Sequence, residues 1–216
     1  MEKYNLIILI PSHNDIESLK KIMVQINEKF KVIVADDCSN DNTSEWLKKN
    51  KIEYIKNPER LGYTLNLINA FRLLIKRFPY IDYILTMDAD GEHNISNLDM
   101  INSLIINNSN INLFLGVRNK KNRLSEIIIS ILFYLRFKIK DPISGFRIYD
   151  KLFLTSIIDK LSSQYFLIDA IYYAKKYNFK IHQFNIKVSK RNGSSRVGNF
   201  FFVNLNIIKS LKYILK

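Results

Sequence analysis

Three short acidic motifs could carry chemistry, and each follows an apolar run. Residues 11–15 read PSHND, residues 36–41 read DDCSND and residues 88–93 read DADGEH. Carboxylates crowded together repel one another unless a cation or hydrogen-bond donors answer them. Asp88 and Asp90, two residues apart in a turn, suit a hard ion such as Mg²⁺ or Mn²⁺ that also holds phosphate oxygens. A solvated turn is the alternative explanation of this pair.

The second motif has two readings of its own. Asp36 and Asp37 have the acceptors to bind the base and ribose of a nucleotide, as an acidic residue does in other nucleotide-binding sheets. The alternative is structural, with the same residues in a helix N-cap region together with Asn42 or Thr43.

Alternating strands and helices are expected to position these motifs. Short apolar runs predict strands at 5–10, 31–35, 52–55, 83–87, 112–116 and 181–188. Apolar residues at helical spacing predict helices at 16–26, 43–49, 65–75, 98–106, 124–137 and 169–177. This order predicts a mainly parallel sheet with helices on both faces. Ligands of such sheets bind outside the carboxyl ends of the strands, where all three motifs lie.

Length and composition favour one compact domain. The chain has 216 residues, of which 47% are hydrophobic. We expect a catalytic domain at 1–199 and an amphipathic helix at 200–216, whose apolar face packs or lies on a membrane. Cys38 is the single cysteine, and no leader pattern precedes the first apolar run, so we expect a cytoplasmic protein. No apolar stretch reaches the roughly 18 uncharged residues of a spanning helix.

The formal charge of +13 favours anionic partners. Phosphorylated ligands, acidic lipid and nucleic acid all qualify, although AT-rich codon usage would also give many lysines. A nucleic-acid-binding module would explain the charge but not the acidic strand ends, so no nucleic acid is expected. The apolar segment 124–137 has basic residues at both ends and reads either as a core helix or as a helix in a lipid interface.

The ordered motifs resemble those of family 2 inverting glycosyltransferases with the GT-A fold. Residues 141–147 (DPISGFR) and 191–196 (RNGSSR) are similar to signatures of the dolichol-phosphate mannosyltransferase-like branch. The resemblance implies a Rossmann-like three-layer α/β/α sandwich, a nucleoside-diphosphate sugar donor and a polyprenyl phosphate acceptor at the inner face of the cell membrane. Transfer to a glycan is the alternative, and a non-catalytic sugar-nucleotide binder stays open. A membrane subunit or a second copy are further candidate partners.

The family pattern also implies roles for individual residues. Its first two motifs hold the nucleotide, and its Asp-x-Asp motif binds metal and diphosphate. Donor contacts are therefore expected from Pro11, His13, Asn14, Asp15, Asp36, Asp37, Gly62, Asp88 and Ala89, and metal ligation from Asp88, Asp90 and Glu92. Glu92 stands where the family often has Gln, and Cys38 where Gly is frequent.

Cations late in the chain are expected to meet the leaving diphosphate. Its departure leaves charge on phosphate oxygens, so catalysis needs positioning and positive charge. Arg191, Ser195 and Arg196 lie in a loop that could close over the diphosphate or an acceptor phosphate, or could be solvated. Arg147 has the same expected role, or pairs with Asp141.

The acceptor decides whether a base is needed. A sugar hydroxyl must lose a proton, which makes Asp141 the expected general base and Asp169 the second candidate. A lipid phosphate, with a second pKa near ~6, arrives largely ionised and attacks unaided, so Asp141 would position it. Asp169 lies in an apolar helical stretch and needs a basic partner or the active site nearby.

Overall fold

The computed structural model describes residues 4–26, 29–121, 124–162 and 166–189. Within this part of the chain, strands form a seven-stranded sheet in the order β3-β2-β1-β4-β6-β5-β7. The strands are β1 (Leu6–Ser12), β2 (Lys31–Asp36), β3 (Glu53–Lys56), β4 (Tyr83–Thr86), β5 (Leu113–Arg118), β6 (Arg147–Asp150) and β7 (Ile181–Ile186). Neighbouring strands run parallel except at β6, which is antiparallel to β4 and β5.

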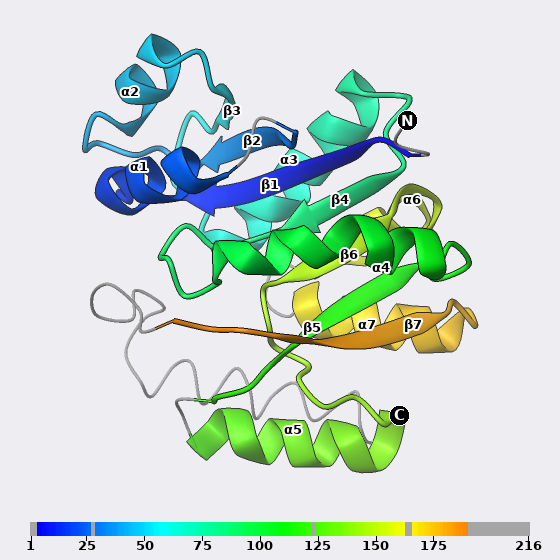
Figure 1. The fold of residues 1–216 in the computed structure, drawn as a ribbon. Helices are drawn as coiled ribbons and strands as arrows, with labels where there is room; N and C mark the ends of the chain where they lie inside the picture. Colours follow the sequence, from blue (N-terminus) through cyan, green and yellow to red (C-terminus); the bar gives the residue numbers. More distant parts are fainter. Residues whose placement is uncertain (1–3, 27–28, 122–123, 163–165, 190–216) are drawn as a thin grey trace.

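Helices cover both faces of the sheet (Figure 1). One face packs against α1 (Ile16–Gln25), α2 (Thr43–Lys49), the 3₁₀ helix η1 (Ile95–Met100) and α4 (Ile101–Asn107). The other packs against α3 (Tyr63–Arg77), α5 (Leu124–Phe137), α6 (Lys151–Ile157), the 3₁₀ helix η2 (Ile158–Lys160) and α7 (Phe166–Lys176). The predicted three-layer α/β/α sandwich is therefore confirmed.

The central strand β1 shows why a short apolar run predicts such a sheet. Side chains alternate between the two faces of a strand, so a strand covered on both sides must be apolar throughout. Ile7 and Leu9 belong to the core under α3 and α7, whereas Ile8 and Ile10 belong to the core under α1 and α4.

The three acidic motifs meet at one edge of the sheet, as predicted. β2, β1 and β4 are adjacent and parallel, and Ser12 at the end of β1 pairs in register with Asp36 at the end of β2. Their carboxyl ends therefore point the same way, and the loops that follow them lie side by side.

The sequence reading missed β6 and α6. Two of the four β6 residues are charged, Arg147 and Asp150, so β6 has no continuous apolar run. The helix expected at 98–106 begins earlier, as η1, and the strand expected to end at 188 ends at Ile186. The helix predicted at 200–216 lies outside the described residues. No helix in the described ranges has the length and apolar character needed to cross a bilayer.

Candidate functional site

The loops after β1 and β2 are locked together by side-chain to backbone hydrogen bonds. His13 Nδ1 lies 2.8 Å from the backbone oxygen of Asp37. The Asn14 amide donates to Ser39 Oγ at 2.9 Å, and Asn14 Oδ1 accepts from the Asn40 amide at 2.8 Å. The first two predicted motifs thus form one structural unit, continuous with Pro11 in β1.

The helix after the first loop begins on this unit. Asp41 Oδ2 accepts from the Ile16 amide at 3.1 Å, close to the start of α1. Asp15 is the N-cap residue of α1, but its side chain does not cap the helix. Its carboxylate lies 3.5 Å from the His13 amide, at the limit of a hydrogen bond. The structure therefore keeps Asp15 beside the predicted nucleotide loops.

Asp37 organises a third loop with both carboxylate oxygens. Oδ1 accepts from the Leu61 amide at 2.8 Å and from Asn57 Nδ2 at 3.0 Å, and Oδ2 accepts from the Gly62 amide at 2.8 Å. The buried carboxylate thereby fixes the turn that leads into α3. Gly62 at that turn has φ +82, a conformation that favours glycine.

Asp36 is a structural residue in this arrangement. It has no exposed surface, and it accepts from the Ser39 amide at 3.0 Å and from the Ser44 hydroxyl in α2. The predicted direct contact between Asp36 and a nucleoside is therefore not supported. The alternative prediction, a structural role for Asp36 at the start of a helix, fits the contacts better. Its hydrogen-bond partner in α2 is Ser44 and not Asn42 or Thr43.

Hydrogen bonds from neighbouring groups hold Asp88 and Asp90 in the loop after β4. The Tyr63 hydroxyl donates to Asp88 Oδ1 at 2.9 Å, and the Asp88 amide donates to His93 Nδ1 at 3.2 Å. Asp90 Oδ1 accepts from the Glu92 amide at 2.9 Å. Burial of the phenol, with the charge of Asp88, raises the pKa of Tyr63 well above its usual value.

A glycine of the 141–147 motif lies directly against this loop. A Cβ atom built on Gly145 would lie 2.6 Å from Asp88 Oδ2, closer than such contacts allow. Thr86 Oγ1 also donates to the Gly145 backbone oxygen at 2.7 Å. The fourth predicted motif is thus in contact with the metal-binding candidate, and Ala89 between the two aspartates is buried.

The side chain of Glu92 faces Arg118. Its Oε1 atom lies 3.6 Å from Arg118 Nη1 and has no hydrogen-bond partner among the described residues. In the same part of the chain, no three His, Cys, Asp or Glu side chains are arranged to share a metal ion. Glu92 thus faces a guanidinium in this structure, and its role as a third metal ligand stays a prediction.

Asp141 is tied to Arg118, the last residue of β5. Arg118 Nε donates to Asp141 Oδ2 at 2.9 Å and Nη2 to Oδ1 at 3.1 Å. The Arg118 amide also donates to Oδ2, at 3.2 Å. Asp141 has no exposed surface. Burial works against the charge of Arg118, but its carboxylate neighbours raise its pKa above the ordinary value.

Arg147 has a different role from the predicted one. It is fully buried, and its guanidinium donates to three backbone oxygens, those of Ser144 at 2.8 Å, Leu167 at 2.5 Å and Pro142 at 2.6 Å. It therefore shapes the 141–147 loop and ties it to α7. The partner of Asp141 is Arg118 and not Arg147.

Asp169 is also buried in α7. Its Oδ2 accepts from the Ser162 amide at 2.6 Å, at the turn that precedes the helix. This hydrogen bond offsets part of the free-energy cost of burying the Asp169 carboxylate, which the sequence analysis expected. Asp169 therefore anchors the turn before α7, and its predicted role as second candidate base stays a prediction.

The segment that leads to the predicted basic loop lies beside the acidic loop after β4. Arg191, Ser195 and Arg196 lie outside the described residues. The chain before them runs along the β4 loop, because the Ser189 amide donates to the Glu92 backbone oxygen at 2.8 Å and Val188 bridges to His93.

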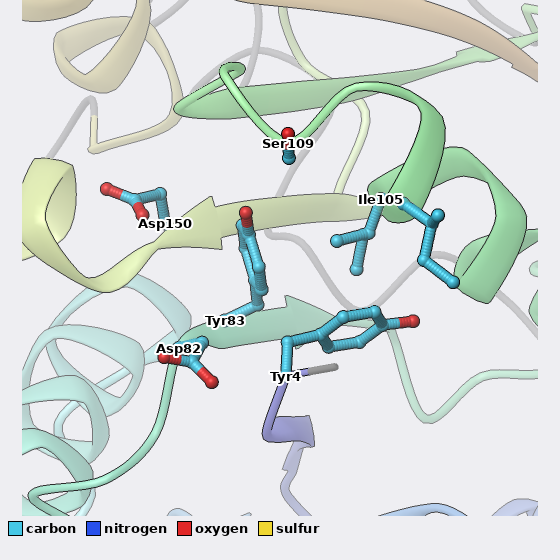
Figure 2. A pocket seen from close by; sticks show the side chains of 7 residues that line it. Tyr4, Asp82, Tyr83, Ile105, Ser109 and Asp150 are labelled. Atoms are coloured by element: carbon cyan, nitrogen blue, oxygen red, sulfur yellow. The ribbon is translucent and has the colours of Figure 1, made fainter. Parts of the chain in front are cut away.

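A separate cavity of about 280 Å³ opens at the opposite edge of the sheet (Figure 2). Tyr4, Asp82, Tyr83 and Asp150 are among its lining residues. Its carboxylates already serve the backbone, since Asp82 accepts from the Asn5 amide at 2.7 Å and Asp150 caps α6. The cavity contains none of the predicted site residues, so the candidate site is the acidic edge.

Sequence reasoning missed Tyr63, Arg118 and Glu126 as parts of this site. Arg118 attracted notice only as one of a basic cluster before the apolar segment 124–137, and Glu126 was not singled out. Tyr63 follows Gly62 directly but has no signal of its own. Their positions depend on which strand ends and loops the fold brings together.

Comparison with known proteins identifies the family of this chain. The model of glycosyl transferase family 2 matches residues 7–154. No curated protein matches the sequence.

Solved structures share the fold at low identity. Glucosyl-3-phosphoglycerate synthase from Mycobacterium tuberculosis, in complex with Mn²⁺, UDP-glucose and phosphoglyceric acid, matches with a TM-score of 0.77 at 14% identity, over 98% of this chain and 80% of that chain. Its complex with Mn²⁺, UDP and glucosyl-3-phosphoglycerate matches with a TM-score of 0.76 at 14% identity, over 99% of this chain and 79% of that chain. A structure described as a mycobacterial protein matches with a TM-score of 0.77 at 13% identity, over 99% of this chain and 74% of that chain. At this identity the likeness shows the fold alone.

Proposed function

This chain belongs to glycosyl transferase family 2, and we propose that it moves a hexose from a nucleoside-diphosphate sugar to polyprenyl phosphate with a divalent metal ion. The donor and metal are supported by the family and by the Asp88-x-Asp90 loop at the carboxyl edge of the sheet. The acceptor is supported by one observation, the ion pair between Arg118 and Asp141.

The ion pair bears on the acceptor because it occupies the predicted base. Both Asp141 oxygens accept from the Arg118 guanidinium, and the carboxylate is buried. Taking a proton from a hydroxyl would break these bonds and leave the guanidinium poorly compensated. Asp169 is likewise buried. An acceptor phosphate that arrives ionised needs neither carboxylate as a base.

The residues present fit a divalent ion bound with the donor. Mg²⁺ usually takes one or two protein carboxylates, together with water and substrate phosphate oxygens. Asp88 and Asp90 supply that number, and the Tyr63 hydroxyl orients Asp88. When bound, the ion would neutralise charge on the diphosphate, as Mn²⁺ and UDP in the related glucosyltransferase complexes also suggest.

In the proposed transfer, an acceptor phosphate oxygen bonds to the anomeric carbon as the bond to the donor diphosphate breaks. The electron pair of that bond leaves with the nucleoside diphosphate, and no proton moves. His13, Asn14 and Asp15 flank the nucleoside, whereas Asp37 shapes its pocket through the backbone of Gly62. Arg191 and Arg196, which follow Ser189 beside Glu92, would close over the phosphates.

Transfer to a hydroxyl is the second candidate. It is favoured by the related synthase, whose complexes contain phosphoglyceric acid or glycerol 3-phosphate. A glycan acceptor belongs to the same class, because it too requires a base. In this case a carboxylate other than the one held by Arg118 would have to take the proton.

The acceptor also gives α5 a role at a lipid surface. α5 exposes six large apolar side chains, those of Leu124, Ile127, Ile128, Ile131, Tyr134 and Leu135. Basic residues lie at its ends, among them Lys120, Arg136 and Lys138. This combination suits a helix that lies in an anionic lipid interface. We therefore propose peripheral attachment at the cytoplasmic face of the cell membrane.

Product analysis tests the proposal. The purified chain is incubated with polyprenyl phosphate, Mn²⁺ and a panel of GDP-, UDP- and dTDP-sugars, and the lipid is analysed by mass spectrometry. One donor should give a hexosyl lipid with wild type but not with Asp90→Ala. The exposed Asp99→Ala variant is the matched control and should behave as wild type. No sugar loss from any donor would refute the enzyme proposal.

A further inference from the structure

Three carboxylates from three different segments converge on the buried side chain of Arg118. Asp141 precedes β6, Glu92 follows β4 and Glu126 lies in the first turn of α5. The guanidinium lies 2.9 Å from Asp141, 3.6 Å from Glu92 and 3.5 Å from Glu126. Its side chain is only 8% exposed.

The fork of arginine suits this task better than another cation would. A guanidinium presents donors in several fixed directions, whereas a lysine ammonium acts as a point charge. Here Nε and Nη2 bind Asp141, Nη1 faces Glu92, and Nη2 also faces Glu126. All three nitrogens are therefore directed at protein carboxylates. The described contacts do not present Arg118 to a phosphate.

The segments that Arg118 links belong to the proposed donor site and to the proposed acceptor site. Glu92 belongs to the loop that carries Asp88 and Asp90, and Asp141 belongs to the loop whose Gly145 lies against Asp88. The gap at Gly145 has no room for a Cβ atom. A shift of the 141–147 loop would therefore also displace the side chain of Asp88.

Resting on the proposed function, we propose that Arg118 is a positioning residue. It holds the 141–147 loop and α5 against the metal loop, and so sets the place of the acceptor relative to the donor diphosphate. Its side-chain contacts in the structure are with protein carboxylates. Its loss should slow transfer and leave nucleotide binding intact, because the loops at 13–15, 36–41 and 57–62 do not contact it.

Two arginine-to-lysine variants test this role on the full-length chain. Arg118→Lys keeps the charge but loses the fork. Arg72→Lys is the matched control, because Arg72 forms an exposed ion pair with Asp159. We expect Arg118→Lys to lower kcat for transfer by about 10- to 100-fold, the usual effect of a small misplacement. The KM for the donor should stay within about twofold, and Arg72→Lys should match wild type.

A double-mutant cycle with Asp141→Asn separates positioning from base catalysis. If Asp141 acts through Arg118, the double variant should be no slower than the slower single variant, since residues acting as a unit are not additive. The pH dependence of kcat should keep the same rising limb in Asp141→Asn. Additive losses, or a lost rising limb, would overturn the proposal.

Hydrogen exchange gives a readout that needs no substrate. Arg118→Lys should raise amide exchange in both 88–94 and 141–147, but not in β1 or β2, and Arg72→Lys should change neither loop. Unchanged exchange in either loop would refute the positioning role even if the enzyme is active. An inactive wild type with the expected exchange pattern would refute the proposed function alone.

Discussion

Tyr63 is the residue whose hydroxyl contacts the proposed metal site without belonging to it. It donates to Asp88 Oδ1 at 2.9 Å. Groups that orient a metal ligand typically change metal affinity by about 10- to 100-fold. Tyr63→Phe should therefore raise the Mn²⁺ concentration needed for half-maximal activity by about tenfold, measured by metal titration at saturating donor.

The exposed Tyr80→Phe serves as the control for that titration. It should leave the metal requirement unchanged. An equal metal requirement in Tyr63→Phe and wild type would show that the hydroxyl does not orient Asp88.

Tyr149 makes stability sensitive to alkaline pH. Its burial raises the pKa of the phenol from about 10 to about 12. Because the folded pKa lies above the unfolded one, this stability is fully present below pH 10 and is lost as pH rises toward 12. The shift corresponds to roughly 3 kcal/mol of unfolding free energy. Urea unfolding of wild type between pH 9 and 12 should show this loss.

Tyr149→Phe should remove that part of the pH dependence. The Tyr149 hydroxyl lies near Arg147 and Thr86 but makes no hydrogen bond of good geometry within the described ranges, so its removal should change stability at pH 7 by less than about 1 kcal/mol. An unaltered alkaline slope in the variant would contradict this assignment.

Single residues also show what the sequence could reveal about the site. Asp88 and Asp90 were found because their motif follows a buried strand. Cys38, where the family often has Gly, adopts φ 58, so the position does require the left-handed conformation. The partner of Asp141 was not predictable, because Arg118 lies 23 residues away and meets it only through strand order.

At the scale of elements, Gly145 joins the 141–147 loop to the loop after β4. In Gly145→Ala the new Cβ would meet Asp88 Oδ2 at 2.6 Å, so the carboxylate must move. We expect at least about a 100-fold loss of kcat, because the proposed metal ligand is displaced. The melting temperature should fall by only a few degrees, since the carboxylate can rotate.

Product formation and thermal unfolding measured on the same preparation check this prediction. Ser156→Ala in α6, away from the acidic edge, is the control. Full activity of Gly145→Ala would show that the contact with Asp88 is not needed for transfer.

Most of the elements were predicted close to their observed bounds. α2 and α5 match their expected bounds, and β1, β2 and β4 lie within two residues of theirs. β6 was missed because its residues carry two charges, and Arg147 is buried only because Pro142, Ser144 and Leu167 offer it carbonyl oxygens. A tertiary arrangement thus overrides the local pattern.

The whole molecule presents α5 as an exposed apolar surface. Leu124 is 71% exposed and Leu135 66% exposed. If this face meets lipid, Ile131→Glu with Leu135→Glu should lower binding to anionic vesicles by roughly tenfold or more, since two apolar side chains are lost from the interface. Vesicle flotation measures the change.

Leu152→Glu on α6 is the matched control, because Leu152 is 76% exposed on another element. It should float as wild type does. Equal loss in both variants would point to charge alone, and no loss in the α5 variant would remove α5 from the membrane account.

The most direct test of the whole account is a competition between acceptors. Wild type, Mn²⁺ and the active sugar donor are mixed with equal amounts of polyprenyl phosphate, polyprenol and phosphoglyceric acid, and the products are counted by mass spectrometry. The account predicts hexosyl polyprenyl phosphate as the main product, and nearly unchanged partition in Asp141→Asn. Sugar found mainly on polyprenol or phosphoglyceric acid, and lost in Asp141→Asn, would contradict it.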